Sequence, residues 1–282
     1  MDLYCVMGNP IAHSRSPWIH ARFAELTGQT LDYGRRLVPL DGFTEAIAVF
    51  RADAAGHARG CNVTVPFKFD AAALAQHVSP RAALAQAVNQ LSFRDDGVHG
   101  DNTDGAGLVA DITRNAGVAL QGRDVLLIGA GGGAAGVLGP LLEAGARRVV
   151  VANRTLDKAI ALVRRHAALA LRHQAELEAQ PLDAVQGPFG VVVNATASSL
   201  SGGEVPVAAS VLAPGTLAVD MMYGPAAAGF MDWARAQGAV PRDGLGMLVE
   251  QAAEAFETWR GVRPPSAQVL AELRDLVVAT AH

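Results

Sequence analysis

A glycine-rich turn between two apolar segments is the strongest constraint on how this chain can fold. The segment 124–128, apolar after Asp124, leads directly into Gly129-Ala-Gly-Gly-Gly-Ala-Ala-Gly136, and a second segment, residues 148–153, is apolar between its polar ends. The pattern predicts a strand, a tight turn, a helix and a second strand, which together begin a Rossmann-type domain. A helix that starts at such a turn presents free N–H groups and the positive end of its dipole to a phosphate.

Three small residues suit this turn to a dinucleotide. Gly129 permits the sharp change of direction, and Gly131 lets a pyrophosphate approach the backbone. Ala134 is small enough for the helix to pack closely on the strand. We therefore expect the cofactor phosphates to lie on Gly129, Ala130, Gly131, Gly132 and Gly133.

The end of the second predicted strand indicates which dinucleotide binds. An Asp or Glu at this place would hydrogen-bond a free ribose 2′-hydroxyl and would repel a 2′-phosphate. The chain instead has Asn153, Arg154 and Thr155, followed by Lys158. Because two cations and a hydroxyl favour a phosphate dianion, we expect NADP as the cofactor.

Length and charge narrow the class of partner. With 282 residues, of which 50% are hydrophobic and 18% are charged, the chain is expected to form two domains with substantial cores. The net charge is −4 and no basic block is present, which argues against nucleic acid and against anionic membrane surfaces. The expected partner is a small-molecule substrate, bound by a monomer or a homodimer.

The cysteines and the first residues favour a reduced, cytoplasmic protein. Cys5 and Cys61 have no metal-type spacing and are too few for a disulfide scaffold. The first residues contain neither a basic segment nor a long apolar one, so no secretory signal is expected. The uncharged stretch 125–142 contains six glycines and Pro140, and it fits a strand, a turn and a helix better than a membrane span.

The order of the segments predicts an α/β fold. Alternating strand-like and helix-like segments in the first hundred residues predict a mostly parallel sheet, and Asp96-Gly97 between two apolar segments predicts an added hairpin. We expect an α/β substrate-binding and catalytic domain over residues 1–104 and a Rossmann-type NADP-binding domain over residues 105–244. Helices over residues 245–282 should return to the first domain. Substrate is then expected between the domains, at the C-terminal ends of both sheets.

Several short motifs occur together in a specific order. They are Ser14-Arg-Ser16, Asn62-Val-Thr64-Val-Pro-Phe-Lys68, Ala87-Val-Asn89, Gly100-Asp-Asn-Thr-Asp104 and Asp220-Met-Met-Tyr223. From Gly8-Asn-Pro10 to Gly246-Met-Leu-Val-Glu-Gln251, the chain resembles the shikimate dehydrogenase family over nearly its whole length. The resemblance implies a reversible, NADPH-dependent reduction of 3-dehydroshikimate to shikimate in chorismate and aromatic amino acid biosynthesis.

The resemblance also implies roles for individual residues. Lys68 would be the catalytic residue that exchanges a proton with the substrate oxygen, and Asp104 would pair with it and hold a ring hydroxyl. Asn62 would orient its neighbours, Thr196 would border the cofactor's ribose and phosphates, and Met221 and Gly244 would lie near the nicotinamide. The residues implied to bind substrate are Ser14, Ser16, Thr64, Asn89, Asp104, Tyr223 and Gln251.

Taken alone, these residues also have plainer readings. Ser16 before Pro17 is an ordinary start for a helix over residues 17–27, although the same helix start can bind an anion. Asp104 is an ordinary helix cap. Lys68 lies in the first turn of a predicted helix, where the dipole disfavours a cation, so its position invites a functional explanation.

The chain departs from the family pattern at Gln86, Gln90 and Ala228-Gly229, which loosens the argument for the usual substrate, and three alternatives are open. They are a quinate/shikimate dehydrogenase that tolerates NAD, a non-catalytic NADPH-binding regulator, and a tetrahydrofolate-linked dehydrogenase of similar layout. The paired serines and Arg154 favour shikimate and NADP, and a regulator would need neither of the two proton-transfer groups. The eight histidines show no metal-ligand spacing, so no metal is expected.

Overall fold

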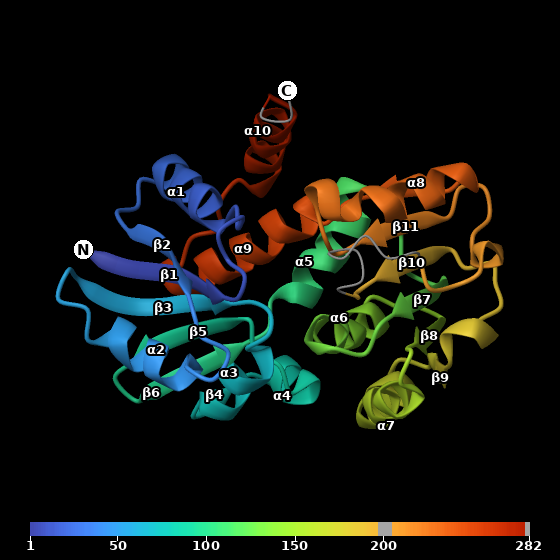
Figure 1. Cartoon of the computed structure of the whole chain (residues 1–282), viewed down its shortest axis with the longest axis horizontal. Coiled ribbons are helices and arrows are strands. Elements are labelled where there is room, and N and C mark those ends of the chain that lie inside the picture. Colours follow the sequence, from blue (N-terminus) through green and yellow to red (C-terminus); the bar gives the residue numbers. More distant parts are fainter. Residues whose placement is uncertain (197–204, 280–282) are drawn as a thin grey trace. The chain divides into compact units, whose positions relative to one another are not determined.

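The computed structural model describes residues 1–196 and 205–279 and divides the chain into two compact units. One unit comprises Met1–Gly107 together with the chain from Leu248 onward, and the other comprises Leu108–Met247. Each is built of a β-sheet with helices on both faces, as Figure 1 shows. The boundaries between the units fall within two helices, α5 (Asp104–Ala110) and α9 (Leu245–Arg260).

The first unit contains a six-stranded described sheet with the order β2-β1-β3-β5-β6-β4. Strands β1, β2 and β3 are parallel, the β5–β6 hairpin is antiparallel, and β4 pairs in parallel with β6. The predicted hairpin and the mostly parallel sheet are therefore confirmed. Besides α5 and α9, whose bounds are given above, the elements of this unit are β1 (Asp2–Gly8), α1 (Ser16–Thr27), β2 (Asp32–Leu37), α2 (Phe43–Arg51), β3 (His57–Val63), α3 (Lys68–Leu74), β4 (His77–Val78), α4 (Pro80–Ala85), β5 (Gln90–Arg94), β6 (Gly97–Asp101) and α10 (Ser266–Ala279).

The two faces of this sheet differ in character. Toward α2 and α3 the strands contribute apolar side chains that pack with Phe43, Phe50 and Phe67 in one buried cluster. Because side chains alternate along a strand, the intervening residues face α1 and α9. Among these are Tyr4, Val6 and Tyr33, which pack with Trp259 of α9. This second face carries the polar side chains described below.

The second unit contains a six-stranded described sheet with the order β12-β11-β10-β7-β8-β9, and every pair is parallel. This is the Rossmann strand order, which reverses between β7 and β10, so the Rossmann-type prediction is confirmed. The central strands are continuous runs of buried apolar residues because helices cover both faces. The elements are β7 (Asp124–Ile128), α6 (Gly132–Glu143), β8 (Arg148–Ala152), α7 (Leu156–Arg172), β9 (Glu176–Gln180), β10 (Val191–Asn194), β11 (Leu217–Asp220), α8 (Ala228–Ala236) and β12 (Val240–Arg242).

Some elements differ from the sequence-based expectation. The helix expected from Pro17 begins at Ser16, where no side chain caps it, although the Ser16 N–H is satisfied by Oγ of Ser14. Strand β9 was not predicted because its alternating polar residues lie half-exposed at a sheet edge. Strand β4 was missed because it has only two residues.

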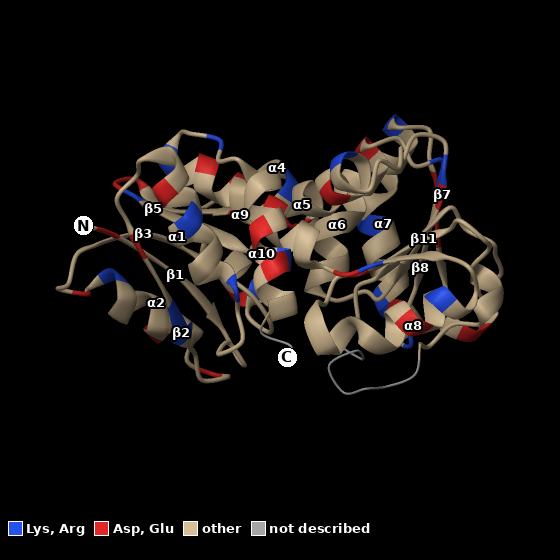
Figure 2. Ribbon diagram, turned by 90° about the horizontal axis from the view of Figure 1, so that it is seen from above, with Lys and Arg blue, Asp and Glu red and all other residues tan. Residues whose placement is uncertain are grey.

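Charged residues of both signs are interspersed along the ribbon of each unit, as Figure 2 shows for the described residues. This distribution agrees with the mildly negative net charge of −4. Within the described ranges, no helix combines the length and the apolar character needed to cross a membrane.

A buried histidine lies at the centre of the aromatic cluster in the first unit. His20 of α1 is fully buried and stacks on Tyr33 with ring centroids 4.1 Å apart, and Phe23, Phe256 and Trp259 surround it. Neither ring nitrogen makes a hydrogen bond of normal geometry to a described residue. Burial lowers the pKa of His20 to about 3, and the nearby Asn62 side chain opposes only part of that shift. The folded protein therefore holds a neutral imidazole here.

We predict an acid-side loss of stability that depends on His20. The folded pKa lies below the unfolded value of about 6.5, so its contribution is complete above that value and is lost as the pH falls toward 3. Between about pH 7.5 and pH 5 the free energy of unfolding should fall by about 2 kcal/mol through this residue. Urea denaturation of wild type and His20→Phe at both pH values measures the difference. A variant that loses stability as steeply as wild type would refute the assignment, and His173→Phe, at an exposed position, is the control.

Candidate active site

The two predicted catalytic side chains contact each other in the first unit. Lys68 is the first residue of α3 and Asp104 is the first residue of α5. Nζ of Lys68 donates to Oδ2 of Asp104 over 2.5 Å. The Lys68 side chain is 13% exposed and that of Asp104 is 2% exposed. The pair is therefore largely withdrawn from water, where a charge-assisted hydrogen bond is strong, while the lysine keeps some accessible surface.

Asn89 fixes the other oxygen of Asp104. Nδ2 of Asn89 donates to Oδ1 of Asp104 over 2.8 Å and to Oε1 of Gln251 over 2.8 Å, and its Oδ1 accepts the backbone N–H of Thr103. Asn89 is 2% exposed, so these contacts replace the water that it has lost. The structure thus joins four predicted site residues, from α3, α5, the residue before β5 and α9, in one network.

Ser14 and Ser16 form a second group at the start of α1. Both are buried, and Oγ of Ser14 donates to Oγ of Ser16 over 3.2 Å. The guanidinium of Arg35 donates twice to the carbonyl oxygen of Ser14, over 2.9 and 2.6 Å. A cation and the N-terminal end of a 12-residue helix therefore flank the two hydroxyls, a setting that favours an anion.

Tyr33 and Asn62 link the two groups. The Tyr33 hydroxyl donates to Oδ1 of Asn62 over 2.7 Å, and Nδ2 of Asn62 donates to the carbonyl oxygen of Asn89 over 3.3 Å. Burial raises the pKa of Tyr33 well above its ordinary value, and a hydrogen bond with Ser16 opposes part of that rise. The phenol thus remains a neutral hydroxyl between Ser16 and Asn62.

Tyr33 and Arg35 were not predicted from the sequence, although a signal was present. The two residues are two positions apart on β2, so their side chains share one face of the sheet. Thr64, which was expected at the site, follows β3 and is half-buried. Its Cγ2 lies so close to where a Cβ at Gly8 would stand that a glycine at the end of β1 is required for this approach.

The second unit places the glycine-rich turn at the reversal of strand order. Gly129 follows β7 with φ +114°, a conformation that disfavours other residues, and a Cβ there would stand 3.2 Å from backbone atoms of Ala195. Helix α6 begins at Gly132. By contrast, a Cβ at Gly131 would meet nothing within 4 Å, so packing inside the protein does not explain the glycine.

The residues expected at the ribose phosphate lie between β8 and α7. Nδ2 of Asn153 donates to the carbonyl oxygen of Thr155 over 2.8 Å, which fixes the turn. Arg154, Thr155 and Lys158 are exposed or partly so. Neither cation has an ion-pair partner in the part of the chain that the structure describes, so both charges are available to an anion.

A buried polar pair organises the ends of β10 and β11. Nδ2 of Asn194 donates to Oδ2 of Asp220, and Oδ1 of Asn194 accepts the hydroxyl of Thr196 over 2.7 Å. Met221 follows directly, with its Cε 3.2 Å from where a Cβ at Gly133 would stand. A Cβ at Gly244 would collide with the carbonyl oxygen of Met221, so that position must be glycine. Thr196, Met221 and Gly244 therefore lie around the same strand ends as the turn.

Tyr223, a further predicted substrate residue, belongs to the second unit. It precedes a short turn over Gly224–Ala227 in the second unit. Cys61, which adjoins the motif around Thr64, is fully buried, and burial raises the pKa of its thiol. A neutral buried thiol is a poor nucleophile.

Comparisons with known proteins agree with this geometry. Family models match residues 6–91 (shikimate dehydrogenase substrate binding domain), 111–201 (shikimate / quinate 5-dehydrogenase) and 244–274 (shikimate 5′-dehydrogenase C-terminal domain). The shikimate dehydrogenase (NADP(+)) of Paracidovorax citrulli (strain AAC00-1) is 71% identical over 274 residues, which cover 97% of this chain and 96% of the relative.

Solved structures show the same fold. An Ael1 enzyme from Pseudomonas putida has a TM-score of 0.87 and 44% identity, over 97% of this chain and 98% of its own. The shikimate 5-dehydrogenase of Thermus thermophilus, in complex with NADP(H) and shikimate, has a TM-score of 0.83 and 32% identity, over 98% and 99% of the two chains.

Proposed function

The chain belongs to the shikimate dehydrogenase family, and from the contact between Lys68 and Asp104 we propose how its residues carry out the family's reaction. The protein is an NADP-dependent oxidoreductase that interconverts 3-dehydroshikimate and shikimate in aromatic amino acid biosynthesis. NADPH, when bound, supplies the hydride that reduces the carbonyl carbon. The oxygen must gain a proton in the same reaction, and the 2.5 Å contact of Lys68 with Asp104 carries our assignment of its source.

Lys68 gives this proton to the substrate oxygen and takes it back in the oxidation. Its ammonium stabilises the negative charge that develops on the oxygen, and it is the general acid for reduction and the general base for oxidation. Asp104 accepts hydrogen bonds from Lys68 and from a ring hydroxyl, so the reacting oxygen is held beside its proton source. Asn89 keeps the carboxylate in place by occupying its other oxygen.

The composition of the chain supports the choice of lysine. Lys68 and Lys158 are the two lysines of the sequence, and the remaining basic residues among its 23 are arginines. An arginine guanidinium holds its proton near neutral pH, whereas a lysine ammonium can exchange a proton with a substrate oxygen.

The substrate carboxylate fits the group at the start of α1. Ser14 and Ser16 offer two hydroxyls, and Arg35 and the helix N-terminus supply positive potential beside them. Thr64, Asn89 and Gln251 are proposed to contact the ring hydroxyls, Asn89 in addition to its bonds to Asp104 and Thr103. Tyr223 is proposed as a further substrate contact from the second unit.

The residues of the second unit fit a dinucleotide with a 2′-phosphate. The open space at Gly131 lets a pyrophosphate reach the backbone N–H groups at the start of α6. Arg154 and Lys158, exposed beside Thr155, suit the additional phosphate. Met221 and Gly244 are proposed to border the nicotinamide.

We predict that shikimate with NADP gives the highest kcat/KM of four pairings, shikimate or quinate with NADP or NAD. The reason is that Arg154 and Lys158 replace the acidic residue that would favour NAD. Steady-state kinetics of the purified chain, at one pH and ionic strength, measures all four. A higher kcat/KM with quinate would show that the substrate assignment is wrong, and a higher kcat/KM with NAD would show the same for the cofactor preference.

Lys68→Ala is expected to lower kcat by about 10²- to 10⁴-fold, because proton transfer is lost, with a much smaller effect on KM. Lys68→Arg keeps the positive charge and is the matched control for charge. It should also be slow, because arginine does not release its proton. A Lys68→Ala enzyme with normal kcat and raised KM, or a Lys68→Arg enzyme with wild-type kcat, would contradict the role.

Arg154→Ala should weaken NADP binding by about tenfold or more and leave NAD nearly unchanged, since a charge-assisted hydrogen bond is worth ~1.5–3 kcal/mol. Dissociation constants for both cofactors can be measured by fluorescence titration. Arg164→Ala, at an exposed position further along α7, is the control for loss of one positive charge. Equal losses for NADP and NAD would argue against a contact with the 2′-phosphate.

A further inference from the structure

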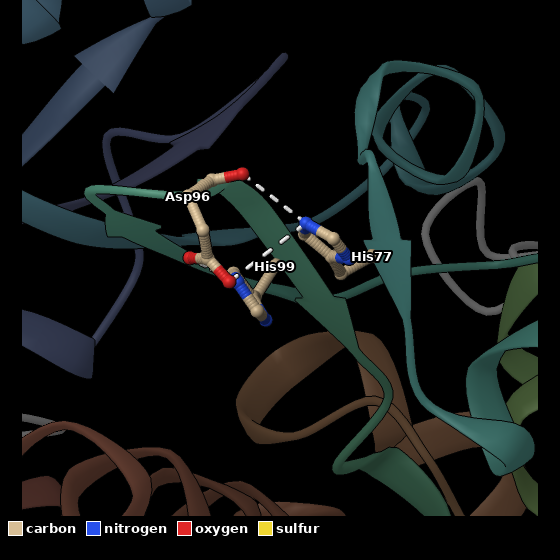
Figure 3. A group of neighbouring side chains, drawn as sticks. All are labelled: His77, Asp96 and His99. Atoms are coloured by element: carbon tan, nitrogen blue, oxygen red, sulfur yellow. Dashed lines mark hydrogen bonds and ion pairs between the residues drawn. The ribbon is translucent and has the colours of Figure 1, made fainter.

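Two histidines and an aspartate converge at the edge of the first unit's sheet. Nε2 of His99 lies 2.8 Å from Oδ1 of Asp96, and Nε2 of His77 lies 3.9 Å from Oδ2 of Asp96 and 3.1 Å from its carbonyl oxygen. One ligand atom from each of the three residues can be chosen so that all lie within 4.8 Å of one another. Figure 3 shows the two imidazoles turned toward the aspartate.

The backbone fixes this arrangement. His77 and His99 are register partners in the parallel pair β4–β6, so both side chains stand on the same face, with ring centroids 4.4 Å apart. Asp96 precedes Gly97, whose φ of +132° turns the chain into β6. This turn places the carboxylate of Asp96 next to the imidazole of His99, three residues later in the sequence.

We propose that His77, Asp96 and His99 bind a divalent transition-metal ion of the zinc class. Imidazole nitrogens with one carboxylate suit Zn²⁺ and its neighbours rather than Mg²⁺ or Ca²⁺, which prefer oxygen ligands. Ligands of a tetrahedral Zn²⁺, at about 2.0–2.1 Å from it, lie roughly 3.3 Å apart. The side chains of His77 and Asp96 are 49% and 64% exposed, so they are free to make the shift of up to about 1.5 Å that this geometry requires.

The surroundings leave room for a further ligand. His77 and His99 both line a cavity of about 250 Å³, together with Ser92, Asp101 and Thr258. Two bonds from Arg81 and one from Ser79 already occupy Asp101, which sets that carboxylate apart from the metal ligands. Gln90 also lines the cavity, and its buried Oε1 has no hydrogen-bond partner among described residues. A water or small anion on the metal thus has space and a polar neighbourhood.

The metal would act as a clamp on an edge strand. β4 has two residues and pairs with β6 at the end of the sheet, so few backbone hydrogen bonds hold it. A bound ion joins β4 to the β5–β6 turn through side chains. It therefore stabilises this edge without contacting Lys68 or the other residues of the active site. This structural role is separate from the dehydrogenase reaction.

Isothermal titration calorimetry of the full-length, untagged chain with Zn²⁺ tests the proposal. We expect one equivalent to bind, at least tenfold more weakly in each of His77→Gln, His99→Gln and Asp96→Asn, and as strongly as wild type in the exposed control His173→Gln. Zinc should also slow hydrogen exchange at the amides of β4 in wild type but not in His99→Gln. Mg²⁺ at the same concentration should do neither.

The proposed metal site would be refuted by any one of three results. These are that Zn²⁺ fails to bind wild type, that it binds the double variant His77→Gln/His99→Gln with unchanged affinity, or that His173→Gln loses as much affinity as His99→Gln. The kcat with shikimate and NADP shows whether each variant is folded, because none of the altered residues belongs to the catalytic network.

Discussion

An ammonium and a carboxylate that touch where little water reaches them form the constraint around which the first unit is arranged. Such a pair is costly unless hydrogen bonds satisfy its remaining lone pairs. Asn89 supplies one of those bonds to Asp104, and it is held in turn by Thr103 and Gln251. Four segments must therefore meet at one point, namely the start of α3, the start of α5, the residue before β5 and helix α9. The fold of this unit is one way to bring them together.

The second unit meets a different requirement. Its proposed ligand brings the negative charge, so the protein needs open backbone and unpaired cations rather than a compensated pair. Gly131 has free space where a side chain would stand, and Arg154 and Lys158 have no ion-pair partner among the described residues. At the ends of β10 and β11, Asn194 donates to Asp220, and Asp220 accepts the backbone N–H of Met222. In the first unit the charged groups are thus already paired with each other, whereas in the second unit the proposed phosphate-binding cations have no ion-pair partner within the described part of the chain before the ligand binds.

The sequence predicted best where a single segment determines the structure. Strands β7 and β8 were placed almost to the residue because both faces of a parallel sheet demand continuous apolar runs. The contact of Lys68 with Asp104 joins residues 36 positions apart. Its prediction rested on resemblance to a family, because no spacing rule along the sequence places these two residues together. Tyr33 and Arg35 went unrecognised because they belong to a partly exposed strand without a motif. His77 and His99 come together only through strand register, which a pattern of histidines along the chain does not reveal.

The first unit draws on both ends of the chain, and this has a consequence for how the protein is made. Arg260 pairs with Asp2, Trp259 packs on Tyr4 and donates to the carbonyl of Leu91, and Gln251 accepts from Asn89. On the ribosome nearly all residues of the second unit emerge before α9 does. The Rossmann-type unit can therefore complete its core during translation, whereas the unit that holds Lys68 must wait, with its sheet uncovered on the α9 side, until α9 has been made.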